Sequence, residues 1–183
     1  MPQVFIAGSR TVSRLNVQIK ERLDNIMKQN FTVLVGDANG ADRAVQRYLA
    51  QHNYRNVVVY CMEVCRNNVG EWPTRHHTAP LSAKRDRHYY GIKDTAMAKD
   101  AGCGFMLWDG VSKGTLTNIV NLLSVRKKAL LYLCPRKMFF TLRRCEDFQL
   151  ALHANGISNV PGFLASLGMS EAASQTRPMA NSG

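Results

Sequence analysis

The sequence predicts an α/β protein of Rossmann-like type, with a parallel sheet of about five strands and helices on both faces. Two observations lead to this prediction. Apolar runs of strand length alternate with segments whose apolar residues recur at helical spacing. The apolar runs are continuous, which is expected of parallel strands that are covered on both faces.

The first elements follow this pattern closely. Residues 3–8 (QVFIAG) are an apolar run that ends in glycine, and Ser13 is expected to cap the helix that follows. Residues 31–36 (FTVLVG) form a second run, and apolar residues at helical spacing fill 41–49. Residues 56–61 (NVVVYC) are the third predicted strand.

A long polar stretch, residues 62–80, separates the third strand from the fourth and reads as a loop that is either functional or mobile. A helix is expected at about 82–101, with Gly91 as a candidate break or bend. The fourth strand is predicted at 104–108 (GFMLW) and is followed by a helix whose apolar residues include Leu116 and Leu123.

The C-terminal part contains the fifth predicted strand, residues 129–133 (ALLYL), and one more candidate helix at 145–153. At 183 residues the chain has the length of one ordinary domain, which we assign to residues 1–169. Residues 170–183 are small and polar, and they are predicted to be disordered.

Composition limits the function classes. The chain is 45% hydrophobic and 20% charged, and no apolar run approaches the length of about 20 residues that spans a bilayer. The N-terminus has no basic segment before its apolar run, so a cytoplasmic protein is expected. Buried, reduced thiols are expected, and no metal or other cofactor is predicted. The five cysteines are Cys61, Cys65, Cys103, Cys134 and Cys145.

The net charge of +11 calls for an explanation. Residues 126–144 contain seven basic residues and no acidic one. This run could neutralise phosphates on a nucleic acid or on a smaller ligand. The simpler alternative is a solvated basic face, in which Arg126, Lys127 and Lys128 complement the dipole at the end of a helix.

Three predicted strands end in glycine-containing turns: residues 8–10 (GSR), 36–43 (GDANGADR) and 108–115 (WDGVSKGT). Ligands of open parallel sheets bind at the carboxyl ends of the strands, and a glycine turn before a helix suits an anionic group. The order of residues in a Walker loop is absent, and so is the dinucleotide-binding fingerprint.

These turns, together with residues 66–72 (RNNVGEW) and especially 93–119 (KDTAMAKDAGCGFMLWDGVSKGTLTNI), resemble the YspA-like branch of the SLOG superfamily. That superfamily also contains the LOG-type phosphoribohydrolases and the DNA-processing protein DprA. The resemblance covers about residues 3–135. It implies a Rossmann-like fold and a site for a nucleotide or a nucleotide-derived ligand.

The chain departs from the LOG-type enzymes, which carry an Arg-Lys pair, a Met three residues later, and then P-G-G-x-G-T-x-x-E. The matching positions here, with two extra residues in the turn, are Lys93, Asp94, Met97, Asp109, Gly110, Gly114, Thr115 and Asn118. An Asn cannot act as a general base as the Glu would. Asp109 is the first candidate for a replacement carboxylate, ahead of Asp42 and Asp37, although each of them could simply stabilise its own turn or helix.

Other side chains near the turns have two interpretations each. Trp72 and Trp108 could stack on a base, but packing is favoured for Trp108. The stretch Arg66–Asn68 could close over a cleft or remain a surface loop. Asn118 could orient a ligand or lie exposed, and Arg10 and Lys93 could contact phosphate or water.

The predicted ligand-binding residues lie in the three turns or on the helices beside them: Gly8, Ser9, Arg10, Gly36, Asp37, Gly40, Asp42, Lys93, Asp109, Gly110, Ser112, Gly114, Thr115 and Asn118. The leading hypothesis is binding of a nucleotide or nucleotide-derived ligand, with a sensor as one form of it. The alternatives are an N-glycoside or phosphoribosyl hydrolase, with Asp109 as its catalytic carboxylate, and a DprA-like nucleic-acid binder. No membrane partner is expected, and the resemblance suggests a homodimer.

Overall fold

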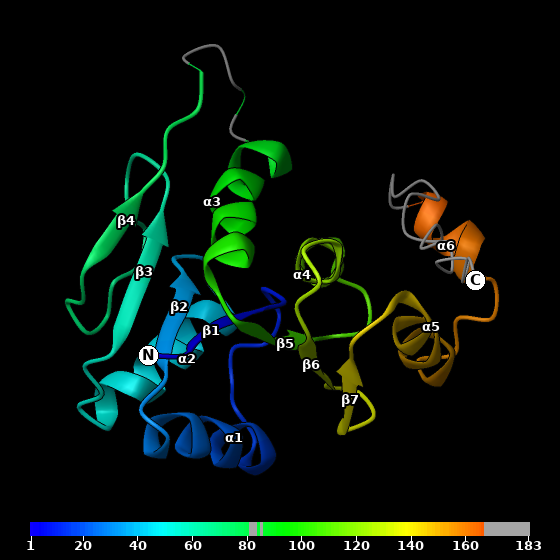
Figure 1. Ribbon diagram of the computed structural model, residues 1–183, viewed down its shortest axis with the longest axis horizontal. Coiled ribbons are helices and arrows are strands. Elements are labelled where there is room, and N and C mark those ends of the chain that lie inside the picture. Colours follow the sequence, from blue (N-terminus) through cyan, green and yellow to red (C-terminus); the bar gives the residue numbers. More distant parts are fainter. Residues whose placement is uncertain (81–83, 85, 167–183) are drawn as a thin grey trace, which may run out of the picture.

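The computed structural model describes residues 1–80, 84 and 86–166. Seven strands form one sheet in the order β4-β3-β2-β1-β5-β6-β7 (Figure 1). The first six strands are parallel to their neighbours, and only β7 runs antiparallel, against β6. The predicted α/β, Rossmann-like fold is therefore confirmed. The tail predicted from residue 170 onward lies outside the described residues.

The five strands predicted from apolar runs are all present: β1 (Gln3–Gly8), β2 (Thr32–Gly36), β3 (Val57–Cys61), β5 (Cys103–Trp108) and β6 (Ala129–Leu133). Two further strands were not predicted. β4 (Thr74–His76) is short, exposed and polar, so it has no apolar pattern. β7 (Met138–Leu142) lies inside the basic run and is buried only at its last residue, so neighbouring charges obscured the signal of this strand.

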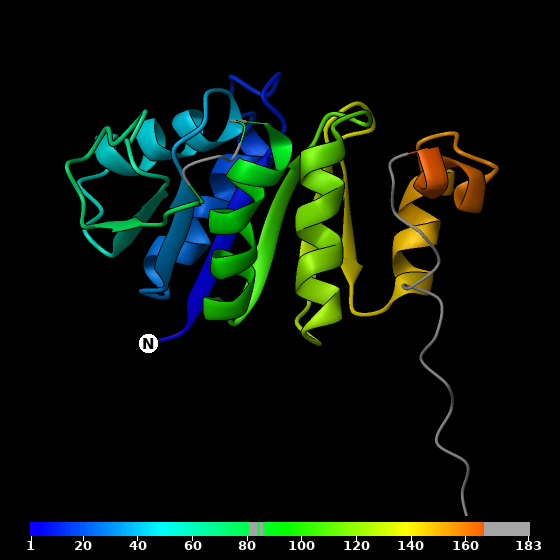
Figure 2. The same ribbon diagram turned by 90° about the horizontal axis from the view of Figure 1, so that it is seen from above.

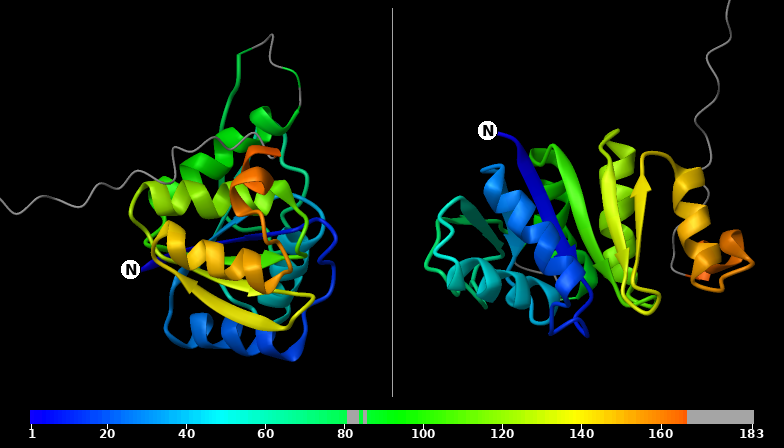
Figure 3. Two further views of the ribbon diagram at one scale, coloured as in Figure 1. Left: turned by 90° about the vertical axis from the view of Figure 1, so that its right-hand side faces the viewer. Right: turned by 90° about the horizontal axis from the view of Figure 1, so that it is seen from below.

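Helices cover both faces of the sheet: α1 (Val17–Lys28), α2 (Ala41–Gln51), α3 (Arg87–Asp100), α4 (Lys113–Ser124), α5 (Cys145–Ala154) and α6 (Val160–Ser166). α3 and α4 run side by side along one face, as Figure 2 shows, and α1 and α2 lie on the other. α5 and α6 lie beyond β7 (Figure 3). The helix α6 was not predicted.

The helix boundaries correct two expectations. Asn16, rather than Ser13, caps α1, because its side-chain oxygen accepts a hydrogen bond of 3.0 Å from the Ile19 N–H. α3 begins at Arg87, five residues later than predicted, and runs through Gly91 without a break. No described residue lies within 4 Å of a Cβ added at Gly91, so packing against the described part of the chain does not require this glycine.

Two apolar layers hold the helices on the sheet. Phe5 and Met106 pack toward α3 and α4, whereas Ile6 and Phe105 pack toward α1 and α2. The alternation arises because successive side chains of a strand point to opposite faces. Each fully buried large apolar side chain contributes roughly 1.5–3 kcal/mol. These layers fix the carboxyl ends of the strands in place.

Lys127 has a structural role at α3, and not at the end of α4 where the sequence suggested a dipole contact. Its Nζ donates a hydrogen bond of 3.0 Å to the Ala98 carbonyl and another to the Lys99 carbonyl. Carbonyls in the last turn of a helix lack partners within the helix, so a lysine there is favourable. Lys127 therefore joins α3 to the segment before β6.

Candidate functional site

The three glycine turns meet at the carboxyl edge of the sheet, with Ser9 at their centre. The Ser9 N–H donates to the Leu107 carbonyl at 2.9 Å, and the Ser9 carbonyl accepts from the Ala41 N–H at 3.2 Å. The hydroxyls of Ser9 and Thr115 share a hydrogen bond of 3.2 Å. One fully buried serine thus contacts the ends of β1 and β5 and the first turns of α2 and α4.

Two glycines are required by this close approach. A Cβ at Gly8 would lie 2.5 Å from the Leu107 carbonyl oxygen and 2.7 Å from the Ala41 Cβ. Gly40 has a φ of +81°, and a Cβ there would clash with the backbone of Arg10. The Arg10 side chain is exposed at the rim of the site. Both glycines therefore let the first two turns touch.

The Asp109 carboxylate organises the third turn. Its Oδ1 accepts hydrogen bonds from the Val111 N–H at 3.0 Å and the Ser112 N–H at 2.7 Å, and its Oδ2 accepts one of 2.6 Å from the Thr11 hydroxyl. Burial raises the pKa of Asp109, but these hydrogen bonds outweigh burial and hold the pKa below its ordinary value. Both carboxylate oxygens of Asp109 therefore accept hydrogen bonds from the protein itself. This favours a role in stabilising the turn over a catalytic role.

A distant helix supports the same turn. Gly110 has a φ of +88°, and its carbonyl accepts a hydrogen bond of 2.9 Å from the Asn155 side chain at the end of α5. Asn155 and Thr11 were both missed by the sequence analysis. Neither has a local signal, because their partners are 45 and 98 residues away in the chain.

Gly114, in the first turn of α4, faces open space on its Cβ side. Among residues 1–80, 84 and 86–166, nothing lies within 4 Å of a Cβ added at Gly114, so packing among them does not require a glycine there. Ser112 is the N-cap residue of α4 but makes no side-chain cap hydrogen bond; its hydroxyl instead lies 3.3 Å from that of Thr115. A helix N-terminus with this much room suits an anionic group.

Asn118 lies one turn further along α4 and is buried, with 5% of its surface exposed. Its Oδ1 has no hydrogen-bond partner among the described residues. Leaving a buried acceptor unsatisfied costs about 1–3 kcal/mol. The exposed position that the sequence allowed for Asn118 is therefore wrong, and a ligand donor would relieve this cost.

Several buried charged side chains lie at the part of the carboxyl edge where β2 ends, which we call the β2 end. Asp37 is 1% exposed and accepts three hydrogen bonds from Arg66, of 2.6, 3.0 and 3.1 Å, one of them from the backbone N–H. Burial raises the pKa of Asp37, but the Arg66 hydrogen bonds and the Lys93 charge outweigh it and hold the pKa below its ordinary value. Arg66 is thus committed to a carboxylate.

Lys93 is buried among three carboxylates. Its Nζ lies 2.9 Å from Asp94 Oδ1 and 3.7 Å from Asp37 Oδ1. Burial lowers the pKa of Lys93, but Asp94 and Asp42 outweigh burial and keep it above its ordinary value. The buried ammonium is therefore charged, and it is already neutralised before any phosphate binds.

Asp42 shares this space. A Cβ added at Gly36 would clash with Asp42 Oδ2 and lie 2.8 Å from Lys93 Nζ, so both groups lie over that glycine. Burial raises the pKa of Asp42 to about 7, and the Lys93 charge offsets only part of the rise. A carboxyl group of this kind exchanges its proton near neutral pH, which is a property of general acids and bases.

The Arg66–Asn68 segment is held on the sheet. The Asn67 side chain donates to the Asp37 carbonyl at 2.7 Å, and the Gln46 amide joins the Gly36 and Asn67 carbonyls at 2.8 and 3.2 Å. Trp72 is 5% exposed and donates from its indole N–H to a backbone carbonyl. These hydrogen bonds therefore hold the segment against the sheet.

The predicted packing of Trp108, which is fully buried, is confirmed.

The cysteines correct the expectation of reduced thiols, since Cys61 and Cys65 form a disulfide. Cys103 and Cys134 are free. Within the described part of the chain, Asp37, Cys61 and Cys65 form a group with metal-ligand chemistry, whose donor atoms lie within 4.8 Å of one another. As a disulfide, the two sulfurs do not offer the thiolates that a metal would need.

The basic run does not form one face. Arg126 and Lys128 precede β6 at the amino edge of the sheet, and Arg143 joins them there because β7 is antiparallel to β6. Arg136 and Lys137 lie in the turn at the opposite edge. The run is therefore divided between the two edges, with Lys127 occupied at α3.

In the described ranges, no helix combines the length and the apolar character needed to cross a bilayer. Comparisons of this chain with protein-family models, with curated proteins and with solved structures found no match.

Proposed function

We propose that this chain binds a nucleotide or nucleotide-derived small ligand at the carboxyl edge of its sheet. The observation that carries the proposal is the buried Oδ1 of Asn118, which has no hydrogen-bond partner in the described part of the chain and lies one turn beyond Gly114 in α4. A hydroxyl or amine of the ligand would supply the donor that this oxygen lacks. The free space at Gly114 would admit its phosphate.

The distribution of charge at the two ends of the site determines where the phosphate of such a ligand would bind. The β2 end holds three carboxylates, Asp37, Asp42 and Asp94, against the two cations Lys93 and Arg66. A phosphate placed there would meet cations that are already paired. We therefore assign the phosphate to the N-terminus of α4, and the hydroxyl-bearing part of the ligand to the carboxylates.

A thermal-shift titration with AMP, ADP-ribose, cyclic AMP and ribose 5-phosphate tests the proposal. At 100 times its dissociation constant, a ligand adds about 2.7 kcal/mol of stability. We expect Gly114→Gln, which fills the open space, to abolish the shift. Gly102→Gln is the matched control, because a Cβ there meets only a backbone oxygen at 3.4 Å, at the amino edge. No shift with any probe, or an unchanged shift in Gly114→Gln, would overturn the proposal.

A second candidate is hydrolysis of an N-glycosidic bond in such a ligand, with Asp42 rather than Asp109 as the relocated carboxylate. The observation that favours it is the pKa of Asp42, near 7, beside a carboxylate-rich space. Incubation with AMP would then release adenine, and Asp42→Asn would abolish the release while Asp109→Asn would reduce it only through the shape of the turn. Absence of free adenine with the unaltered protein removes this candidate and leaves the binding proposal standing.

A further inference from the structure

A cavity of about 250 Å³ lies on the α1 face of the sheet, at the amino ends of the strands. It is lined by α1 and by the first residues of β1, β5 and β6. From Cys103 to Trp108, β5 covers five residue steps, or about 16 Å at roughly 3.3 Å per residue. The cavity is therefore at the opposite edge from the candidate nucleotide site.

This part of the sheet has an uncovered face. The right panel of Figure 3 shows α1 over the middle of the sheet, with β6 and β7 beside it and no described helix in front of them. Phe139 of β7 is 37% exposed there, and its ring lies 4.7 Å from that of Tyr132. The guanidinium of Arg22 on α1 lies 5.8 Å from the Phe139 ring centre.

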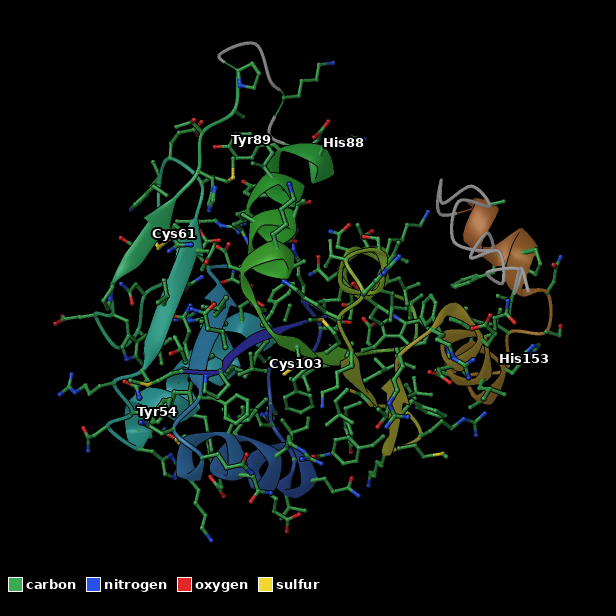
Figure 4. The ribbon with its side chains drawn as sticks, in the orientation of Figure 1. Tyr54, Cys61, His88, Tyr89, Cys103 and His153 are labelled. Atoms are coloured by element: carbon green, nitrogen blue, oxygen red, sulfur yellow. A yellow bond between two sulfur atoms is a disulfide. The ribbon has the colours of Figure 1, made fainter. Side chains whose placement is uncertain are left out.

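The lining combines two cations with an apolar floor. Arg22 and Lys128 contribute the charges, Phe105 and Leu130 lie on the floor, and no lining residue carries a carboxylate. Cys103 also lines the cavity, at the start of β5 (Figure 4). Burial raises the pKa of this thiol, and the positive charge of Lys128 opposes part of the rise.

We propose that this cavity is a second binding site, for a small organic monoanion that joins one acidic group to an aromatic or aliphatic body. The acidic group would lie between Lys128 and Arg22, and the body would cover Phe105 and Leu130. The volume of about 250 Å³ lies just below the range for small-molecule pockets, which starts at about 300 Å³, so only a small ligand would fit. A ligand of one or two rings, or a medium-length chain, fits this size.

Charge argues against a second copy of this chain as the occupant. The chain has a net charge of +11, and the two charged side chains that line the cavity, Arg22 and Lys128, are both basic. Two copies that met through this face would bring like charges together, which is unfavourable. A small anion that enters the cavity would instead neutralise the positive charge of these side chains, without repulsion between two chains.

The probe for the test is the two-ring anion naphthalene-1-sulfonate, and naphthalene-1-sulfonamide is its matched uncharged control. We expect saturable binding of one sulfonate probe per chain. Lys128→Met should weaken that binding about three- to ten-fold, and Lys128→Met with Arg22→Gln should weaken it further. Binding of the uncharged probe should be the same in all these proteins. Lys99→Met, an exposed substitution on α3, is the control for lost charge.

Location is tested separately from charge. Thr141 lines the cavity and is exposed, so Thr141→Trp should fill the space and remove binding of both probes without unfolding the chain. In a background with Cys134→Ser and Cys145→Ser, the sulfonate probe should slow alkylation of Cys103 by iodoacetamide. Sulfonate binding that is unaffected by both Lys128→Met and Thr141→Trp overturns the site. Probe binding that requires dimerisation in sedimentation measurements assigns the face to a second copy and overturns the small-anion proposal.

Discussion

The two ends of the carboxyl edge treat buried polar groups in opposite ways. At the β2 end, Asp37 has Arg66 and Lys93 as partners, and Lys93 in turn has Asp94. At the α4 end, the Asn118 Oδ1 has no described partner. The first arrangement is complete without a ligand, whereas the second is incomplete. A polar group that folding leaves unsatisfied is therefore the stronger indication of a binding site than a cluster of charges.

The largest effect is expected from Lys93→Met at the β2 end. Removing one partner of a buried ion cluster leaves uncompensated charge and costs about 3–5 kcal/mol in the free energy of unfolding. Urea denaturation at pH 7 measures the loss, with the exposed Lys99→Met as control. The loss of stability in Lys93→Met should be smaller at pH 5, because the carboxylates left without their lysine partner can then take up protons. A loss below about 1 kcal/mol would show that the β2 end is not held by this cation.

Asp42 should make the stability of the chain depend on pH. Its pKa is about 7 in the folded chain and about 3.9 when unfolded, so the folded form holds its proton more tightly. The free energy of unfolding should therefore fall as pH rises from about 4 to about 7 and then level off.

Asp42→Asn should remove that decline and stabilise the chain at pH 8 by roughly 2–4 kcal/mol, since one pKa unit corresponds to about 1.36 kcal/mol. Denaturation series at pH 5 and pH 8 measure the difference, and the exposed Glu21→Gln is the control. An equal decline in Asp42→Asn would assign the pH dependence to another group.

Asn118→Leu tests the α4 end. Replacing an unsatisfied buried acceptor with an apolar side chain of similar size should raise the free energy of unfolding by about 1–3 kcal/mol. The same variant should lose the thermal shift produced by the nucleotide probes. Asn121→Leu, on the same helix, is the control for adding an apolar residue. If Asn118→Leu instead destabilises the chain, the Asn118 side chain is satisfied in the folded protein, and the contrast with the paired charges at the β2 end is wrong.

The smallest effects come from paired glycine substitutions. Gly114→Ala should stabilise α4 by about 0.5–1 kcal/mol, because alanine is the better helix former and its Cβ meets no described residue. Gly36→Ala should destabilise the β2 end, because its Cβ would clash with Asp42 and approach Lys93, and neither can move without losing a charged neighbour. Thermal melts of both variants check the opposite signs. If both substitutions changed the melting temperature in the same direction, the α4 end would not be more open than the β2 end.

Much of the fold was predictable because its signal is local. Continuous apolar runs identified β1 and four more of the seven strands, and the position of the glycine turns followed from the rule for parallel sheets. β4 lacked any apolar residue, and β7 was hidden by basic neighbours.

The site was less predictable because its chemistry depends on pairings across the chain. Arg66 and Asp37 are 29 residues apart, and their ion pair decides that neither is free to bind a phosphate. Lys93, expected as a phosphate partner, is neutralised by residues that include its neighbour Asp94. That adjacency was the one signal in the sequence that could have indicated it.

The contact between Asn155 and the Gly110 carbonyl has a consequence for the C-terminal part of the chain. It links the turn that begins α4 to the end of α5, so the two share a coupling free energy. A ligand that restrains the Asp109 turn must also slow hydrogen exchange in α5, and truncating the chain after β7 would loosen a turn more than thirty residues upstream. Helix α5 therefore helps to hold the turn that begins α4.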